Sequence, residues 1–138
     1  MKPVKVLLIE DNAGDILLIH QVLAREPFPI SIHVAVDGKQ AIQMLAAREF
    51  QPDLVILDLN IPNPSGFVVL ECIEPEVPAV VFTSSSNPQD RQYSIDLGAK
   101  DYVQKPTDLR KFVQQVSQIV RTWGRPEPTD GVTQRSLC

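Results

Sequence analysis

The sequence predicts an α/β domain in which helices cover both faces of one parallel sheet. Short apolar runs alternate five times with longer segments of helical periodicity, and only brief connections separate them. Because the crossover between two parallel strands is right-handed, five such units place helices on both sides of the sheet. Short strands and brief connections are typical of flavodoxin-like folds. We therefore predict a doubly wound (βα)5 sheet with strand order 2-1-3-4-5.

The predicted strands are the five apolar runs. Residues 4–9 and 54–57 are continuously apolar, as expected of strands buried on both faces of a parallel sheet. The predicted strands are residues 4–9, 30–36, 54–57, 78–83 and 101–104.

Capping residues mark the predicted helices. Asn12 can cap the first helix, Asp37 with Gln40 forms a capping box for the second, and Gly98 can end the fourth. The predicted helices are residues 12–24, 37–46, 67–73, 87–97 and 108–123.

Length and composition indicate one globular domain. We assign residues 1–123 to it and residues 124–138 to a C-terminal tail, whose Gly-, Pro- and Thr-rich composition buries too little apolar surface to fold. Against 17 acidic residues there are 13 basic ones, which does not favour nucleic-acid binding. The apolar runs are far shorter than the roughly 20 residues of a membrane span, and no signal peptide is evident. We expect a cytoplasmic protein that binds neither nucleic acid nor membrane, with Cys72 in the core and Cys138 a free thiol.

Charged and hydroxyl side chains follow four of the predicted strands. In an open α/β sheet, ligands bind beyond the carboxyl ends of the strands, so these side chains are expected to meet at one edge. They are Glu10 and Asp11 after the first strand, Asp58 after the third, Thr83 at the end of the fourth and Lys105 after the fifth.

A single acidic residue after a strand is more often a solvated turn residue than a ligand. Three carboxylates at one edge repel one another unless a lysine or a cation compensates, and hard oxygen ligands favour Mg²⁺. A carboxylate beside Mg²⁺ can attack phosphorus and form an acyl phosphate. The Lys105 ammonium and the Thr83 hydroxyl could then bind phosphoryl oxygens. The two histidines, His20 and His33, are interpreted as a helix-surface residue and a strand residue rather than catalysts.

Four motifs together resemble the receiver domains of response regulators, the CheY-like superfamily. They occur in the family's order within residues 4–123. The motifs are Glu10-Asp11-Asn12, residues 58–66 (DLNIPNPSG), residues 81–85 (VFTSS) and residues 102–106 (YVQKP).

The resemblance implies a role for each matching residue. Asp58 would be the phosphoacceptor, and Asp11, Asp58 and the Asn60 carbonyl would bind Mg²⁺, with Glu10 acting through water. Thr83 and Lys105 would contact the phosphoryl group, and Thr83 with Tyr102 would form the switch. A cis peptide bond would join Lys105 to Pro106. The sequence departs from the family at Ser65, where an Asp is common, and we expect no loss of phosphorylation from this change.

A narrower likeness is to the stand-alone receivers that serve phytochrome-type histidine kinases. Residues 10–18, 82–90 and 105–109 carry it. The resemblance implies a single-domain response regulator that catalyses only its own phosphorylation and dephosphorylation. Its partners would be a sensor histidine kinase and a second copy of the chain, bound through the surface of the fourth helix, fifth strand and fifth helix.

Two alternatives belong to other classes. A small aspartyl-phosphate hydrolase would use the same nucleophile, but it needs a general acid and a cap over the substrate. Asn60 is not an acid, and no cap insertion is evident. A flavin-binding electron carrier could share the sheet topology, but charged Asp11, Asp58 and Lys105 at its phosphate end would be unfavourable.

Overall fold

A five-stranded parallel sheet in the order β2-β1-β3-β4-β5 forms the centre of the domain, which confirms the predicted topology. The computed structural model describes residues 2–124. The strands are β1 (Val4–Ile9), β2 (Ile30–Ala35), β3 (Leu54–Leu57), β4 (Ala79–Thr83) and β5 (Asp101–Gln104). The helices are α1 (Ala13–Leu23), α2 (Gly38–Ala46), α3 (Gly66–Glu71), α4 (Pro88–Asp96) and α5 (Leu109–Trp123).

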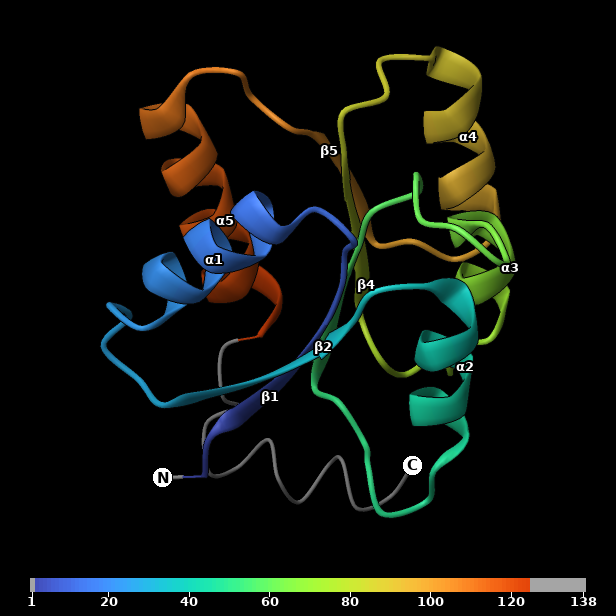
Figure 1. The fold of residues 1–138 in the computed structure, drawn as a ribbon, viewed down its shortest axis with the longest axis horizontal. Coiled ribbons are helices and arrows are strands. Elements are labelled where there is room, and N and C mark those ends of the chain that lie inside the picture. The colour runs from blue at the N-terminus through green and yellow to red at the C-terminus, as the bar shows by residue number, and fades with distance from the viewer. Residues whose placement is uncertain (1, 125–138) are drawn as a thin grey trace.

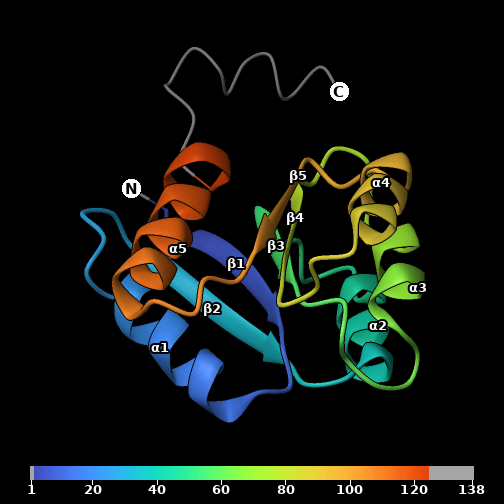
Figure 2. The same cartoon turned by 90° about the horizontal axis from the view of Figure 1, so that it is seen from above.

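Two layers of helices enclose the sheet. Helices α1 and α5 lie on one face, and α2, α3 and α4 lie on the other (Figure 1). Figure 2 shows the same separation from above. Alternate side chains of β1 point to opposite faces of the sheet. Val6 and Leu8 pack in the core under α1 and α5. Leu7 and Ile9 pack in the core under α2 and α3. Burying each of these side chains contributes about 1.5–3 kcal/mol.

Strand β2 ends one residue earlier than predicted. The backbone N–H of Val36 donates to Oε1 of Gln40 at 2.8 Å instead of extending the strand. Asp37 accepts the backbone N–H of Gln40 at 2.7 Å, so the predicted capping box is formed, with Val36 rather than Asp37 as the donor to Gln40.

Helix α3 also ends earlier than predicted. The N–H groups of Cys72 and Ile73 donate to carbonyls only three residues back, those of Val69 and Leu70, which tightens the last turn. Cys72 is therefore exposed, and the prediction that it is a core residue is wrong. The helical spacing of Ile42, Leu45 and Ala46 predicts an inward position for all three on α2, but Ala46 is also exposed.

The predicted C-terminal tail, residues 124–138, lies outside the described residues apart from Gly124, which caps α5. Cys138 lies outside them as well. Within residues 2–124, no helix is both long enough and apolar enough to span a bilayer.

Candidate functional site

Asp58 lies at the centre of the polar residues that follow the strands. It comes directly after β3 and is 5% exposed. Its Oδ1 accepts hydrogen bonds from the Thr83 hydroxyl at 2.9 Å and from the backbone N–H of Asn60 at 3.0 Å. Its Oδ2 accepts one from Nζ of Lys105 at 2.9 Å. The structure therefore brings the residue predicted as phosphoacceptor together with Thr83 and Lys105.

Lys105 is held by three carboxylates. Its Nζ lies 2.6 Å from Oε1 of Glu10, 2.8 Å from Oδ2 of Asp15 and 2.9 Å from Oδ2 of Asp58. An ammonium group has three N–H donors, so this set uses all of them.

The predicted acidic cluster is present. Glu10, Asp11 and Asp58 each offer a carboxylate oxygen, and these oxygens lie within 4.8 Å of one another. Glu10 and Asp58 are buried, whereas Asp11 is exposed, so the cluster is open to solvent on one side. Three oxygen donors of this kind, with one lysine for compensation, fit a hard divalent cation such as Mg²⁺.

Burial and the neighbouring charges act on the protonation of these groups. Burial raises the pKa of Glu10 to about 7, although the hydrogen bond with Lys105 opposes the change. Burial would also raise the pKa of Asp58, but the Asn60 N–H and the Lys105 ammonium outweigh it and lower this pKa. For Lys105, burial favours the neutral form, but the hydrogen bonds with Asp15, Glu10 and Asp58 outweigh it and raise the pKa. Asp58 is thus held ionised beside a charged lysine.

The loop after Asp58 is anchored by its own apolar residues. Leu59 and Ile61 are buried, and Asn60 between them is exposed. The backbone N–H of Gly66 closes the loop by donating to the carbonyl of Leu59 at 3.3 Å.

The first turn of α2 also holds this loop. The backbone N–H of Gly38 donates to the Pro62 carbonyl at 2.8 Å, and that of Lys39 donates to the Asn63 carbonyl at 2.9 Å. A Cβ atom on Gly38 would lie 2.2 Å from the carbonyl oxygen of Pro64, so only glycine fits this approach. The sequence pattern predicts a helix start at residue 37 but gives no sign of this contact with the loop.

Tyr102 lies inside the domain. It is 6% exposed, and its hydroxyl donates to the carbonyl of Ser85 at 3.0 Å. The ring is therefore buried, and its hydroxyl is bonded within the domain rather than to solvent. The contact joins β5 to the loop that follows Thr83.

A protein-family model described as the response regulator receiver domain matches residues 6–117. The chain belongs to this family. Receivers are signalling domains of two-component systems, and the flavodoxin-like fold described above is the fold of CheY-like receivers.

Curated relatives resemble this receiver over part of their length. It is 35% identical over 109 residues to a probable cyclic di-GMP phosphodiesterase of Vibrio cholerae, which covers 75% of the chain and 24% of that protein. It is 31% identical over 123 residues to the transcriptional regulatory protein PrrA of Mycobacterium tuberculosis, which covers 87% of the chain and 51% of PrrA. The receiver thus spans about half, or less, of the length of these relatives.

Two solved structures are similar over most of both chains. The phosphorylated cyanobacterial phytochrome response regulator RcpA is 35% identical with a TM-score of 0.82, and the match covers 88% of this chain and 94% of RcpA. The Mn²⁺-bound form of response regulator Rcp1 is 30% identical with a TM-score of 0.82, and the match covers 91% of this chain and 98% of Rcp1.

One predicted feature of the receiver is absent from this structure. The cis peptide bond among the described residues joins Asn63 to Pro64, not Lys105 to Pro106. Either isomer of an X–Pro bond costs little, so the presence of a proline does not reveal which bond is cis.

Asp15 is a further residue of the site that the sequence did not predict. It lies in the first turn of α1, where a carboxylate favours the helix dipole, and its Oδ2 also contacts Lys105. Its only signal in the sequence is its position three residues after the capping Asn12 and four after Asp11.

The two histidines lie on α1 and β2. His20 is exposed, and the partly buried His33 contacts Ser31 and packs against Phe50.

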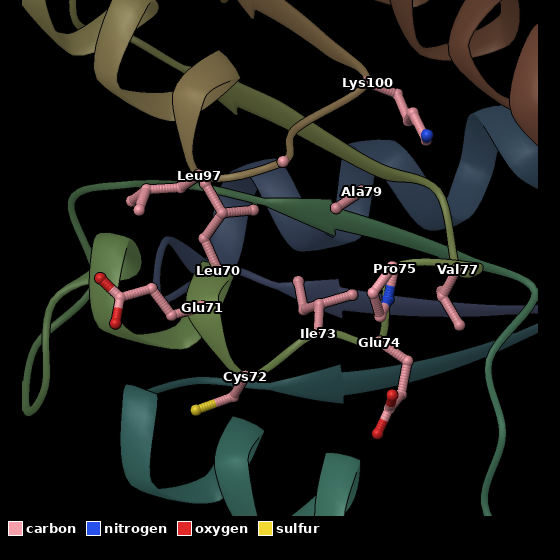
Figure 3. A pocket seen from close by; sticks show the side chains of 11 residues that line it. Leu70, Glu71, Cys72, Ile73, Glu74, Pro75, Val77, Ala79, Leu97 and Lys100 are labelled. Atoms are coloured by element: carbon pink, nitrogen blue, oxygen red, sulfur yellow. The ribbon is translucent and has the colours of Figure 1, made fainter.

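A pocket of about 400 Å³ lies near the amino ends of β4 and β5, whereas Asp58 follows the carboxyl end of β3. Figure 3 shows its lining side chains, including the carboxylates of Glu71 and Glu74 and the ammonium of Lys100. None of the residues that line it belongs to the Asp58 site.

Proposed function

We propose that this receiver accepts a phosphoryl group on Asp58 from a sensor histidine kinase, in a reaction that depends on Mg²⁺. The observation that carries the proposal is the environment of the Asp58 carboxylate. It is buried, it is bonded to both the Thr83 hydroxyl and the Lys105 ammonium, and it lies within the acidic cluster.

In this reaction an Asp58 oxygen attacks phosphorus, and an O–P bond forms as the bond from phosphorus to the donor nitrogen breaks. The nitrogen leaves with the electron pair of that bond. The ammonium of Lys105 and the hydroxyl of Thr83, both 2.9 Å from Asp58 oxygens, can turn to phosphoryl oxygens without a large displacement.

Asp11, Asp58 and the Asn60 carbonyl would hold Mg²⁺, with Glu10 acting through water. The ion would neutralise negative charge on the transferring group. The cluster's oxygen donors and its one solvent-exposed member, Asp11, support this assignment. So does the Mn²⁺-bound form of the similar regulator Rcp1.

The receiver's catalysis would be limited to its own phosphorylation and dephosphorylation. An aspartyl-phosphate hydrolase, by contrast, needs a general acid beside the nucleophile. The residue two positions after Asp58 is Asn60, whose contact with Oδ1 of Asp58 is a backbone N–H at 3.0 Å.

We further propose that the signal leaves through Thr83 and Tyr102. A phosphoryl group on Asp58 would draw the Thr83 hydroxyl away from its present bond. Movement of residues 84–87 would then reach Tyr102 through its hydrogen bond with Ser85.

The surface of α4, β5 and α5 is the proposed homodimer interface. Arg91 of α4 lies against β5, because its Nη1 donates to the Tyr102 carbonyl at 3.0 Å. Ile95, four residues later and so on the same side of the helix, is 40% exposed. An exposed apolar side chain beside β5 is explained if a second copy covers it.

A phytochrome-type kinase is the proposed phosphoryl donor, on the strength of the similarity to RcpA, a phytochrome response regulator. We place the receiver in the cytoplasm, where such kinases use ATP, and we propose no nucleic-acid or membrane partner.

The test is to incubate the protein with acetyl phosphate, with and without Mg²⁺, and to map the modified residue after borohydride reduction. Labelling of Asp58 that requires Mg²⁺ is expected. Labelling of another residue, or equal labelling in EDTA, would refute the corresponding part of the proposal.

A further inference from the structure

Asp15 is fixed at the first turn of α1 with its carboxylate on Lys105. The side chain of Asn12 caps the helix by accepting the backbone N–H of Asp15 at 2.9 Å. This cap fixes the backbone of Asp15, and its Oδ2 lies 2.8 Å from Nζ of Lys105, which comes from the end of β5. The contact therefore joins two elements separated by most of the chain.

The ion pair is only partly screened by solvent. The side chain of Lys105 is 9% exposed, and that of Asp15 is 28% exposed. A charged hydrogen bond in such surroundings is stronger than one on an open surface.

Asp15 differs from the other two carboxylates on Lys105. Glu10 and Asp58 belong to the cluster whose oxygens lie within 4.8 Å of one another, and Asp15 does not. A divalent cation held by that cluster would repel the ammonium and would share the charge of Glu10 and Asp58. Asp15 would keep its attraction for Lys105 in that state.

Phosphorylation would change the same balance. The carboxyl group of Asp58 loses its negative charge when it becomes an acyl phosphate, so its attraction for Lys105 weakens. The ammonium then has a donor free for a phosphoryl oxygen, provided that it stays in place.

We propose that Asp15 is a positioning residue that retains the Lys105 ammonium at the site while Asp58 is phosphorylated. The inference rests on the function proposed above. It assigns to α1 a part in the reaction that goes beyond its packing against the sheet.

The first test is a double-mutant cycle of Asp15→Asn and Lys105→Ala, read as the free energy of unfolding in EDTA. With Lys105 present, Asp15→Asn removes an attractive partner and should destabilise the protein. In Lys105→Ala, the same substitution relieves repulsion among carboxylates and should be clearly less destabilising. The effect of Asp15 on the helix dipole is common to both backgrounds and cancels. Equal effects in both would overturn the inference.

The second test is the rate at which acetyl phosphate labels Asp58 at saturating Mg²⁺. Asp15→Asn should slow it about fivefold, as expected for loss of a partly exposed charged hydrogen bond. Asp15→Glu keeps the charge and should recover most of the rate, whereas Asp15→Asn should have no effect on the residual rate of Lys105→Ala.

A wild-type labelling rate in Asp15→Asn, together with a coupled stability cycle, would show that Asp15 only tethers α1 to Lys105 and would overturn the positioning role. Failure of the wild-type protein to be labelled would refute the proposed function instead. The stability cycle would still report on the contact in that case.

Discussion

The Tyr102 hydroxyl donates a hydrogen bond to the Ser85 carbonyl at 3.0 Å, and Ser85 lies two residues after Thr83. Thr83 in turn donates to Asp58 at 2.9 Å. A short chain of contacts thus leads from the proposed phosphorylation site to the buried face of β5. If the contact with Ser85 depends on the position of Thr83, a change at Asp58 will alter the environment of the tyrosine ring.

This coupling can be measured on Tyr102 alone. The chain has two tyrosines, so Tyr93→Phe leaves Tyr102 as the only one. In that variant, NMR of the labelled tyrosine ring should shift when beryllofluoride, a phosphoryl mimic, is added with Mg²⁺. The shift should be lost in Asp58→Asn. An unchanged Tyr102 signal in the beryllofluoride-bound protein would rule out the switch.

The proposed dimer predicts an effect of charge at Ile95. Ile95→Glu places a carboxylate in the apolar part of the interface and should reduce self-association at least about tenfold, because burying an unpaired charge is costly. Sedimentation velocity with and without beryllofluoride measures the effect. Leu17→Glu on α1, where Leu17 is 61% exposed, is the matched control and should associate like the wild type. A wild-type protein that stays monomeric in both conditions contradicts the dimer.

The acidic cluster predicts how stability depends on pH in the metal-free protein. The pKa of Glu10 rises from 4.5 to about 7 on folding, so the folded protein binds more protons than the unfolded chain between these values. The free energy of unfolding should therefore fall as pH rises through this window, by about 3 kcal/mol.

Denaturation in EDTA at a series of pH values would test this prediction, and Glu10→Gln should remove the decline. The lowered pKa of Asp58 acts with the opposite sign, since its contribution is present above 3.8 and is lost as pH falls below that value. A wild-type curve without a decline between pH 4.5 and about 7 would contradict the assignment to Glu10.

Gly38 provides a test of how the loop after Asp58 is held. Gly38→Ala would place a methyl group 2.2 Å from the Pro64 carbonyl oxygen, so the loop that carries Asn60 must move. The increase in melting temperature that Mg²⁺ produces should shrink by half or more, because a displaced Asn60 carbonyl binds the ion less well.

Asp37→Ala is the matched control for this experiment. It removes the side-chain cap of α2 and should cost about 1 kcal/mol of stability, but it adds no atom near Pro64. The Mg²⁺-induced increase should persist in this control. If Gly38→Ala also keeps the full increase, the α2 contact does not position the loop.

Much of the site could be predicted because strand order determines it. The carboxyl ends of β1, β3 and β5 are at one edge of the sheet, so Asp11, Asp58 and Lys105 meet whatever the details of packing. Asp15 was missed because it lies on a helix, and the direction of a helical side chain depends on how the helix packs. The exposure of Cys72 was missed because α3 tightens into its last turn earlier than the apolar pattern indicates. The cis bond was misplaced because proline permits either isomer.

The most direct test of the account is intact-mass spectrometry after incubation with acetyl phosphate and Mg²⁺. Asp53→Asn is the matched control for Asp58→Asn. Asp53 lies just before β3, and its carboxylate accepts the backbone N–H of Lys5 in a solvent-exposed hydrogen bond. The account predicts one added phosphoryl group in the wild-type protein and in Asp53→Asn, and none in Asp58→Asn. Undiminished phosphorylation of Asp58→Asn would contradict it.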